Sequence, residues 1–494
     1  MENQTRRVTP IMGWASWNCF RTNISEAKMK EQADLLVSTG LKEYGYEYFN
    51  MDDGFFGGRD ETGELQFHPE RFPNGIKVIA DYAHSLGLKA GIYAEAGDNT
   101  CGYYYDNEKT GGLHAGLYGH EEADLRKLLS EGGFDFIKVD WCGGLRIGLD
   151  EEEQYTKIAN IIRKIEKEED RQIIYNICRW QFPGEALTNI ADSWRCGVDI
   201  TPDFQSVLYQ IDELKALAKF CRPGHINDCD MMQLGNGMTY EEDKTHFSMW
   251  CMLSTPLMLG CDLNEIKRET LDILKNKELI AINQDPLCKQ AVVVKEYRDV
   301  DGSVLAEVWV KPLKSVENRR AAIAFLNRSE CEMTLEVDYK LAGIAGRVIK
   351  IRDITAHQDM EILPEEKLKV SVVPHGTVVY EVESTDGTEI TDLNEHKEWS
   401  RNLPKKITLE RAEELVREGA LLIDVRNPAE YATYHLNLAI NIPYQDMYLK
   451  TDKMLPDRAR KIVLYCATGK RSLLAKLLLD RKGYKEVFYL GGIK

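Results

Sequence analysis

The chain has 494 residues, of which 43% are hydrophobic and 29% are charged, which is typical of a globular protein with about two to four domains. Its 80 acidic residues outnumber its 63 Lys and Arg residues and give a formal net charge of −17. Because proteins that bind nucleic acid normally carry a basic patch, this balance argues against a nucleic acid as partner.

The N-terminal segment and the cysteines indicate a cytoplasmic protein. The segment MENQTRRVTP lacks the apolar run of a signal peptide, and no apolar stretch reaches the ~20 residues that a bilayer requires. We therefore expect no membrane association. The twelve cysteines are scattered, without the paired spacing of a zinc site, and we expect mostly reduced thiols in a cytoplasmic enzyme.

Short β-rich runs alternate with amphipathic helical segments from residue 9 to residue 286. A first helix is expected after Ser25, whose side chain suits an N-cap. Further strands are predicted at 46–51, 88–94, 134–139 and 172–177, and further helices at 76–86, 121–131, 152–167, 202–220 and 240–254. This alternation predicts parallel strands with crossover helices, and about eight such units favour an α/β fold, a (β/α)8 TIM barrel, over residues 8–290.

Two smaller domains are expected after the barrel. Residues 291–384 hold β-rich runs separated by turn residues, without a helical period, and predict an all-β antiparallel sandwich. Residues 385–403 are polar and aperiodic, so we interpret them as a linker. Residues 404–494 return to alternating helices and strands and predict a small α/β domain.

Acidic residues gather where the expected barrel strands end. Asp140 follows the strand FDFIKV, and Asp199 follows WRCGV. In a barrel these strand ends share one face, where active sites lie, and cleavage of a glycosidic bond needs two carboxyl groups. Lys138 lies on the same side of its strand as Asp140 and would lower the pKa of that carboxyl, which suits a nucleophile. The alternative interpretation of each aspartate is a helix N-cap or a turn residue.

Several motifs occur in one order along the chain: MGWASW from residue 12, YEY through DDG at 46–54, GIYAEAG at 91–97, KVD at 138–140, WRCGVDI at 194–200, PGHINDCDM at 223–231 and NQDP at 283–286. Together they resemble family 27 of the glycoside hydrolases, the α-galactosidases and α-N-acetylgalactosaminidases. The resemblance covers about residues 9–380, the barrel and the sandwich together. It implies a retaining exo-α-galactosidase that removes terminal α-linked galactose from oligosaccharides or glycoconjugates by double displacement.

The resemblance also implies a role for individual residues. Asp140 would be the nucleophile, and Asp199 would be the acid that protonates the leaving oxygen and then the base that activates water. The substrate-binding residues implied are Trp17, Asp52, Asp53, Tyr93, Lys138, Cys142, Arg195 and Asp230. Carboxylates would accept from sugar hydroxyls while Lys and Arg donate, which makes these hydrogen bonds charge-assisted. No metal or organic cofactor is implied, and the oligomeric state, a homo-oligomer included, is left open.

Two features depart from the family pattern. Arg179 stands where many relatives carry Glu, in a loop that contacts the substituent on C2 of the sugar, so α-N-acetylgalactosaminidase or a related α-glycosidase remains an alternative. Asp52 together with Asp53 favours a sugar with a C6 hydroxymethyl group, hence galactose. Cys101 and Cys142 match a pair that forms a disulfide in secreted relatives, but in a reducing cytoplasm we expect the dithiol.

The C-terminal segment carries a second set of motifs, LIDVRNPAEY from residue 422 and VLYCATGKRS from residue 463. They resemble the rhodanese-like domain over about residues 405–494. Cys466 ends an expected strand, and the following backbone N–H groups, with Lys470 and Arg471, would stabilise its thiolate. The alternatives are a protein that works as a sulfurtransferase through this domain, with the barrel as scaffold, and a structural module with an inert cysteine.

Overall fold

The computed structural model forms two compact units, Met1–Gly197 with Ile211–Trp399 and Val198–Gln210 with Ser400–Lys494. The residues described are 7–300, 302–362, 367–386, 390, 393, 405–444, 447, 451, 454–482 and 484–493. Most of the linker expected at 385–403 lies outside these residues.

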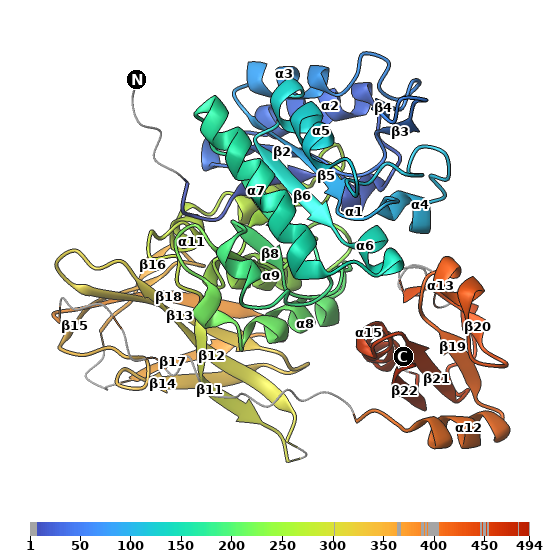
Figure 1. The fold of residues 1–494 in the computed structure, drawn as a ribbon. Coiled ribbons are helices and arrows are strands. Elements are labelled where there is room, and N and C mark those ends of the chain that lie inside the picture. The colour runs from blue at the N-terminus through green and yellow to red at the C-terminus, as the bar shows by residue number, and fades with distance from the viewer. Residues whose placement is uncertain are drawn as a thin grey trace. The chain divides into compact units, whose positions relative to one another are not determined.

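The first unit begins with a barrel of parallel strands (Figure 1). The strands, in their order around the barrel, are β10 (Leu257–Leu259), β1 (Met12–Ala15), β2 (Tyr48–Met51), β5 (Lys89–Glu95), β6 (Phe136–Asp140), β7 (Ile174–Ile177), β8 (Ser193–Arg195) and β9 (Ile226–Asp228). A parallel bridge between Met232, just after β9, and Leu259 of β10 closes the ring. The eight-stranded (β/α)8 barrel predicted from the alternating pattern is therefore confirmed.

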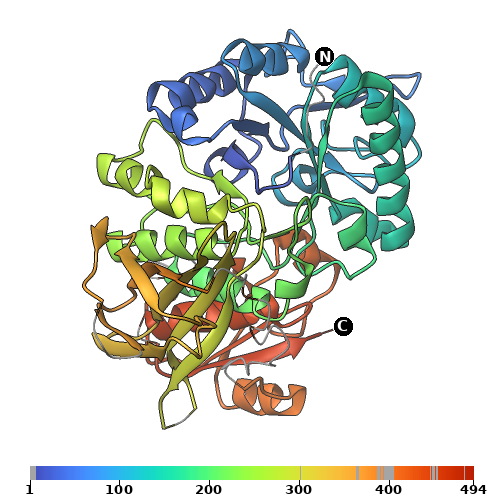
Figure 2. The ribbon, with the colours of Figure 1, turned by 90° about the vertical axis from the view of Figure 1, so that its left-hand side faces the viewer.

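Helices connect the strands, and Figure 2 shows them around the strands of the blue-to-green region. They are α1 (Trp17–Phe20), α2 (Glu26–Ser38), α3 (Lys77–Ser85), α4 (Cys101–Tyr105), α5 (Glu121–Leu125), α6 (Cys142–Ile147), α7 (Glu151–Glu169), α8 (Phe204–Leu214), α9 (Tyr240–Met252), α10 (Arg268–Leu274) and α11 (Lys277–Asn283). Their starts follow local chemistry, since the side chain of Ser25 accepts from Lys28 N–H and Thr239 forms a capping box with Glu242. The segment predicted as one helix at 121–131 continues after α5 as a π-helical turn.

The β-sandwich follows the barrel in the same unit. Its larger sheet contains β11 (Val292–Arg298), β12 (Val304–Leu313), β13 (Arg319–Asn327), β18 (Thr377–Ser384), β15 (Val348–Asp353) and β16 (Gln358–Asp359), and its smaller sheet pairs β14 (Met333–Asp338) with β17 (Lys367–Val372). β3 (Phe56–Arg59) and β4 (Leu65–Phe67) form a separate hairpin. Alternate residues such as Val308, Phe325 and Leu335 point into one buried core, as the period of a half-buried strand requires. The predicted all-β sandwich is confirmed.

The second unit contains a parallel sheet in the order β20 (Ile440–Asn441), β19 (Leu421–Asp424), β21 (Ile462–Cys466) and β22 (Val487–Gly492), with helices α12 (Leu409–Arg417), α13 (Pro428–Thr433) and α15 (Lys470–Arg481). Asn427 and Glu430 form a capping box around Pro428, which suits the first turn of a helix. The small α/β domain predicted for this end of the chain is confirmed. Among the described residues of both units, no helix is long and apolar enough to cross a bilayer.

Candidate active site

A cavity in the barrel is lined by side chains from all eight strands of the barrel sheet. Because these strands are parallel, their carboxyl ends lie at the same end of the barrel, which is where barrel enzymes place their active sites. Of the residues predicted from the sequence, those that line the cavity are Asp52, Tyr93, Lys138, Arg195 and Asp230. These five side chains therefore face the same cavity.

Lys138 forms an ion pair with Asp52 inside this cavity. Its Nζ donates to Oδ2 of Asp52 at 2.8 Å, and both side chains are largely buried. Nζ also lies 5.6 Å from the ring centre of Tyr93 and 6.0 Å from that of Trp17. Burial disfavours the charged lysine, but Asp52 and Asp140 outweigh it and raise the pKa of Lys138 above its ordinary value. The cavity therefore presents a fixed ammonium group beside an acceptor and two aromatic faces.

Asp53 differs from Asp52 in its surroundings. Its Oδ2 accepts from the N–H of Gly102 at 2.6 Å, and its Oδ1 accepts from the N–H of Gly54 at 2.7 Å. The carboxyl is buried, and this burial raises its pKa to about 7 although the two N–H groups act in the opposite direction. The adjacent aspartates thus present one carboxylate paired with a lysine and one carboxyl whose charge depends on pH near neutrality.

Arg195 and Asp230 form the second ion pair of the cavity. Nη2 of Arg195 lies 2.7 Å from Oδ2 of Asp230, and both side chains are about 95% buried or more. Asp230 adopts a left-handed backbone conformation with φ of +80°, which is uncommon outside glycine and clusters at functional sites. Its N–H donates to Oδ1 of Asp228 at 2.8 Å, and its carbonyl oxygen accepts from Nε1 of Trp250 at 3.0 Å. These contacts hold the carboxylate in place.

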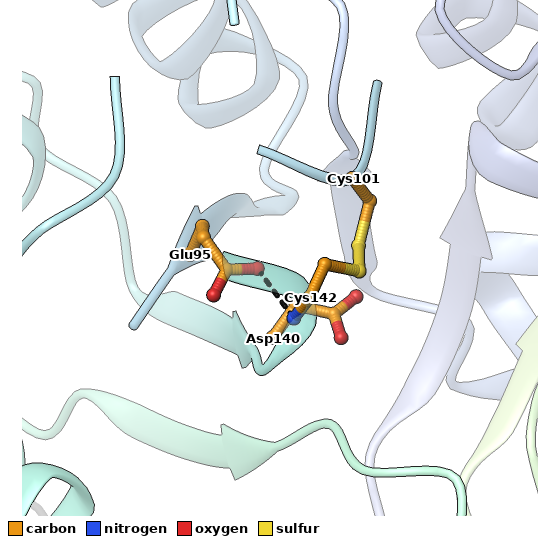
Figure 3. Close-up of side chains that lie close together, drawn as sticks. All are labelled: Glu95, Cys101, Asp140 and Cys142. Carbon is orange, nitrogen blue, oxygen red and sulfur yellow. Dashed lines mark hydrogen bonds between the residues drawn. A yellow bond between two sulfur atoms is a disulfide. The ribbon is translucent and has the colours of Figure 1, made fainter. Parts of the chain in front are cut away.

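Asp140 is the last residue of β6 and is buried. Its Oδ1 accepts from the N–H of Trp141 at 2.9 Å, and its carbonyl oxygen accepts from the N–H of Ala96 at 2.9 Å. Figure 3 shows it beside Glu95 and the pair Cys101 and Cys142, and the side-chain ligand atoms of these four residues all lie within 4.8 Å of one another. The predicted nucleophile therefore sits in a closely packed acidic and sulfur-containing group.

The expectation that Cys101 and Cys142 are free thiols is wrong. The structure joins them in a disulfide, with their Cα atoms 5.5 Å apart (Figure 3), which is within the usual separation for such a bond. The expectation was based on the cellular compartment, whereas the fold brings the start of α4 against the start of α6. Disulfide sulfurs are not thiolates, so the group near Asp140 offers two carboxylates and lacks the sulfur ligands of a zinc site.

Glu95, the last residue of β5, belongs to the acidic residues predicted at the strand ends, but the sequence indicated no role for it. Its side chain is fully buried and accepts N–H groups from Gly97 and Cys142 at 2.9 Å and from Gly144 at 3.3 Å. Burial and the neighbouring Asp140 raise its pKa well above the ordinary value, although the N–H groups oppose this shift. Its position at a barrel strand end was the available signal. Glu95 fixes the turn that follows Asp140.

Asp199 and Arg179 are not among the described residues that line the cavity. Asp199 lies in the loop after β8, in the segment Val198–Gln210 of the second unit, and its side chain is half-buried. Its separation from Asp140 stays a prediction. Nε of Arg179 lies 2.8 Å from Oε1 of Glu151, the first residue of α7. Its contact with a C2 substituent also stays a prediction.

In the predicted C-terminal loop, the sulfur of Cys466 contacts two of the residues that follow it. Cys466 ends β21 and is buried, its Sγ accepts from the N–H of Gly469 at 3.1 Å, and it lies 3.6 Å from Oγ of Ser472. Arg471 forms a two-point ion pair with Glu430 at 2.7 and 2.8 Å, while Lys470 begins α15. The loop thus places a backbone donor against the sulfur, while the guanidinium group of Arg471 is paired with the carboxylate of Glu430.

Comparisons with known proteins agree with this architecture. Residues 9–285 match the family described as Alpha galactosidase A, residues 305–382 match the Alpha galactosidase C-terminal beta sandwich domain, and residues 408–494 match the Rhodanese-like domain. The three matches follow the barrel, the sandwich and the small α/β domain in order.

Individual relatives support the same assignment. Alpha-galactosidase 3 of Arabidopsis thaliana is 37% identical over 377 residues, which cover 75% of this chain and 81% of that protein. Alpha-galactosidase A of Cellvibrio japonicus is 38% identical over 393 residues, covering 75% of this chain and 91% of that protein. Among solved structures, alpha-galactosidase I from Mortierella vinacea superposes with a TM-score of 0.68 at 27% identity, over 78% of this chain and 100% of the other.

Proposed function

Since the chain belongs to the alpha galactosidase A family of glycoside hydrolases, we propose that it is a retaining exo-α-galactosidase. Its substrate would be a terminal α-linked galactose of an oligosaccharide or glycoconjugate. The observation that carries this proposal is the cavity at the strand ends, in which Lys138 pairs with Asp52 and Arg195 pairs with Asp230. Such a cavity suits a polyhydroxylated ring because it offers fixed donors beside fixed acceptors.

The reaction is a double displacement. The carboxylate of Asp140 attacks the anomeric carbon while the acid form of Asp199 gives its proton to the departing oxygen, so that a galactosyl ester forms and the aglycone leaves. The carboxylate of Asp199 then takes a proton from water, the water attacks the anomeric carbon, and the ester bond to Asp140 breaks. Two inversions give net retention. This chemistry requires the two carboxyl groups about 5–5.5 Å apart.

Selectivity for galactose follows from the acceptors. Asp52 would accept from the axial hydroxyl at C4 and Asp53 from the hydroxyl at C6, while Lys138 would donate to the oxygens at C3 and C4. Both carboxyl groups are buried, so a sugar that lacks a hydroxyl at either place forfeits a hydrogen bond that water cannot easily replace, which costs about 1–3 kcal/mol. An epimer at C4 is therefore a poor substrate.

An α-N-acetylgalactosaminidase is the alternative within the hydrolases. Arg179 replaces an acceptor by a cation and is itself paired with Glu151. The substitution Arg179→Glu should change the ratio of the rates on nitrophenyl α-galactoside and nitrophenyl α-N-acetylgalactosaminide. Glu151→Gln is the matched control, because it breaks the same ion pair and keeps Arg179. An unchanged ratio in Arg179→Glu would remove this residue from the C2 contact.

A second activity is proposed for the rhodanese-like domain. The N–H of Gly469 donates to the sulfur of Cys466, which ends β21 just before the start of α15. We therefore propose sulfur transfer through Cys466. A thiosulfate:cyanide assay that gives activity in the wild type and none in Cys466→Ala supports it, and equal rates in both proteins contradict it.

The central test of the glycosidase proposal is the substitution Asp140→Ala. The variant should keep the wild-type fold by circular dichroism and lose the cleavage of nitrophenyl α-galactoside. Azide should restore the release of nitrophenol and yield a β-galactosyl azide, because a small anion then enters from the face that the carboxylate occupied. Absence of rescue, or an α-galactosyl azide as product, would count against Asp140 as nucleophile.

A further inference from the structure

The second unit joins the C-terminal domain to a short segment from the barrel sequence. The segment Val198–Gln210 belongs to the same compact unit as the residues after 400. Within this unit the hydroxyl of Tyr444 lies 2.8 Å from Oγ1 of Thr201 and 3.4 Å from Oδ2 of Asp203. Tyr444 follows β20, and its N–H donates to the carbonyl oxygen of Val425 at 3.1 Å. One tyrosine therefore connects the sheet of the rhodanese-like domain with this segment.

The three side chains that form this contact are buried. Tyr444, Thr201 and Asp203 are each at most 6% exposed. Burial and the nearby Asp203 raise the pKa of Tyr444 well above its ordinary value, so the hydroxyl keeps its proton and acts as a donor. Removing one partner of a buried hydrogen bond leaves the other unsatisfied. The tyrosine hydroxyl is therefore one of the groups that hold this segment in place.

Hydrogen bonds within the segment link Thr201, which contacts Tyr444, to Asp203 and Ser206. Oγ1 of Thr201 donates to Asp203 at 2.6 Å, the N–H of Thr201 donates to Oγ of Ser206 at 3.0 Å, and the N–H of Ser206 donates to Asp203 at 3.0 Å. These bonds form a closed network at the start of α8. Asp199 precedes Thr201 by two residues, so a shift of the network displaces its backbone.

We propose that Tyr444 of the rhodanese-like domain is a positioning residue for Asp199. This inference rests on the proposed function, in which Asp199 is the general acid and base. Tyr444 acts through the backbone of residues 199–203 and has no contact with the sugar in this role. General acid catalysis is sensitive to such positioning because proton transfer requires hydrogen-bond geometry with the leaving oxygen.

The test compares two α-galactosides with different demands for an acid. A nitrophenolate leaves with little protonation, whereas the glucose of the disaccharide melibiose must be protonated as it leaves. In full-length Tyr444→Phe, which keeps the ring, kcat/KM for melibiose should fall about tenfold and kcat/KM for nitrophenyl α-galactoside should fall less than threefold. Thr201→Val removes the other partner of the bond and should give the same pattern. The double variant should be no worse than either single variant.

Tyr484→Phe is the matched control. Tyr484 is a buried tyrosine of the same domain whose hydroxyl donates to the carbonyl oxygen of Leu455, and its substitution should leave both rates at wild-type values once thermal unfolding shows a folded protein. If Tyr444→Phe does not fold, Thr201→Val tests the same bond. Equal losses on both substrates, or no loss, would overturn the positioning role while the wild-type activity upholds the proposed function. A wild type that is inactive on both substrates would overturn both.

Discussion

Glu95 and Asp140 lie opposite each other in register at the ends of the adjacent parallel strands β5 and β6. Two buried carboxyl groups therefore share one edge of the barrel, and the charge of Asp140 contributes to the raised pKa of Glu95. Glu95 also accepts the N–H groups of Cys142 and Gly144. The strand that carries the proposed nucleophile and the turn that follows it are thus held by the neighbouring strand.

The substitution Glu95→Gln should impair catalysis through this turn. The amide keeps the size of the side chain but directs an NH2 group at backbone donors, which leaves at least one of them unsatisfied and costs about 1–3 kcal/mol of stability. We expect kcat for nitrophenyl α-galactoside to fall at least tenfold with a smaller change in KM, because Asp140 is displaced. Glu152→Gln, at an exposed position of α7, is the control. Wild-type kcat in Glu95→Gln would refute the positioning of this turn by Glu95.

Asp53 should make the stability of the fold depend on pH. Burial raises its pKa from 3.8 to about 7, so the folded state binds the proton more tightly than the unfolded chain. Its contribution to stability is fully present below pH 3.8 and is lost as the pH rises to about 7. Asparagine stays neutral, so the difference in Tm, Asp53→Asn minus wild type, should increase between pH 4 and pH 7. The control is Asp272→Asn, an exposed position on α10, and a Tm difference for Asp53→Asn that stays flat with pH would contradict the raised pKa.

The sequence predicted the elements and the strand-end residues because both depend on local patterns. Asp52 and Asp140 end buried apolar runs, and parallel strands bring such ends together. It was harder to predict which of these side chains pair with one another. Lys138 and Asp52 are separated by 86 residues along the chain, and their pairing depends on the geometry of the closed barrel. Glu95 carried the same signal as Asp140, but its orientation toward the backbone of the next strand's turn is a matter of register.

Contacts between distant segments were outside the reach of sequence patterns. Tyr444 and Thr201 are separated by 243 residues, and neither stands in a motif that indicates the other. The disulfide was misjudged for a different reason, because the expectation weighed the compartment and had no information on the distance between Cys101 and Cys142. Both contacts depend on the three-dimensional fold, which local sequence patterns do not describe.

The disulfide predicts the number of titratable thiols. The chain has twelve cysteines, and the bond between Cys101 and Cys142 leaves ten as thiols. Protein denatured without reductant should therefore react with ten equivalents of a thiol reagent, and reduced protein with twelve. Twelve in both conditions would refute the bond. The Cys101→Ser, Cys142→Ser double variant should lose about 3–4 kcal/mol of stability, as expected for a loop of this length.

The positive charge of Lys138 should contribute to the binding of the sugar and its transition state. Lys138→Met keeps the length of the side chain but removes the ammonium group that pairs with Asp52. The sugar then loses a charge-assisted donor worth about 1.5–3 kcal/mol, so kcat/KM for nitrophenyl α-galactoside should fall about ten- to hundred-fold. Lys157→Met is the matched control, because Lys157 also pairs with a carboxylate, Glu121, but is half-exposed on α7. Equal kcat/KM values in the two variants would show that the Lys138 cation has no part in binding the sugar or its transition state.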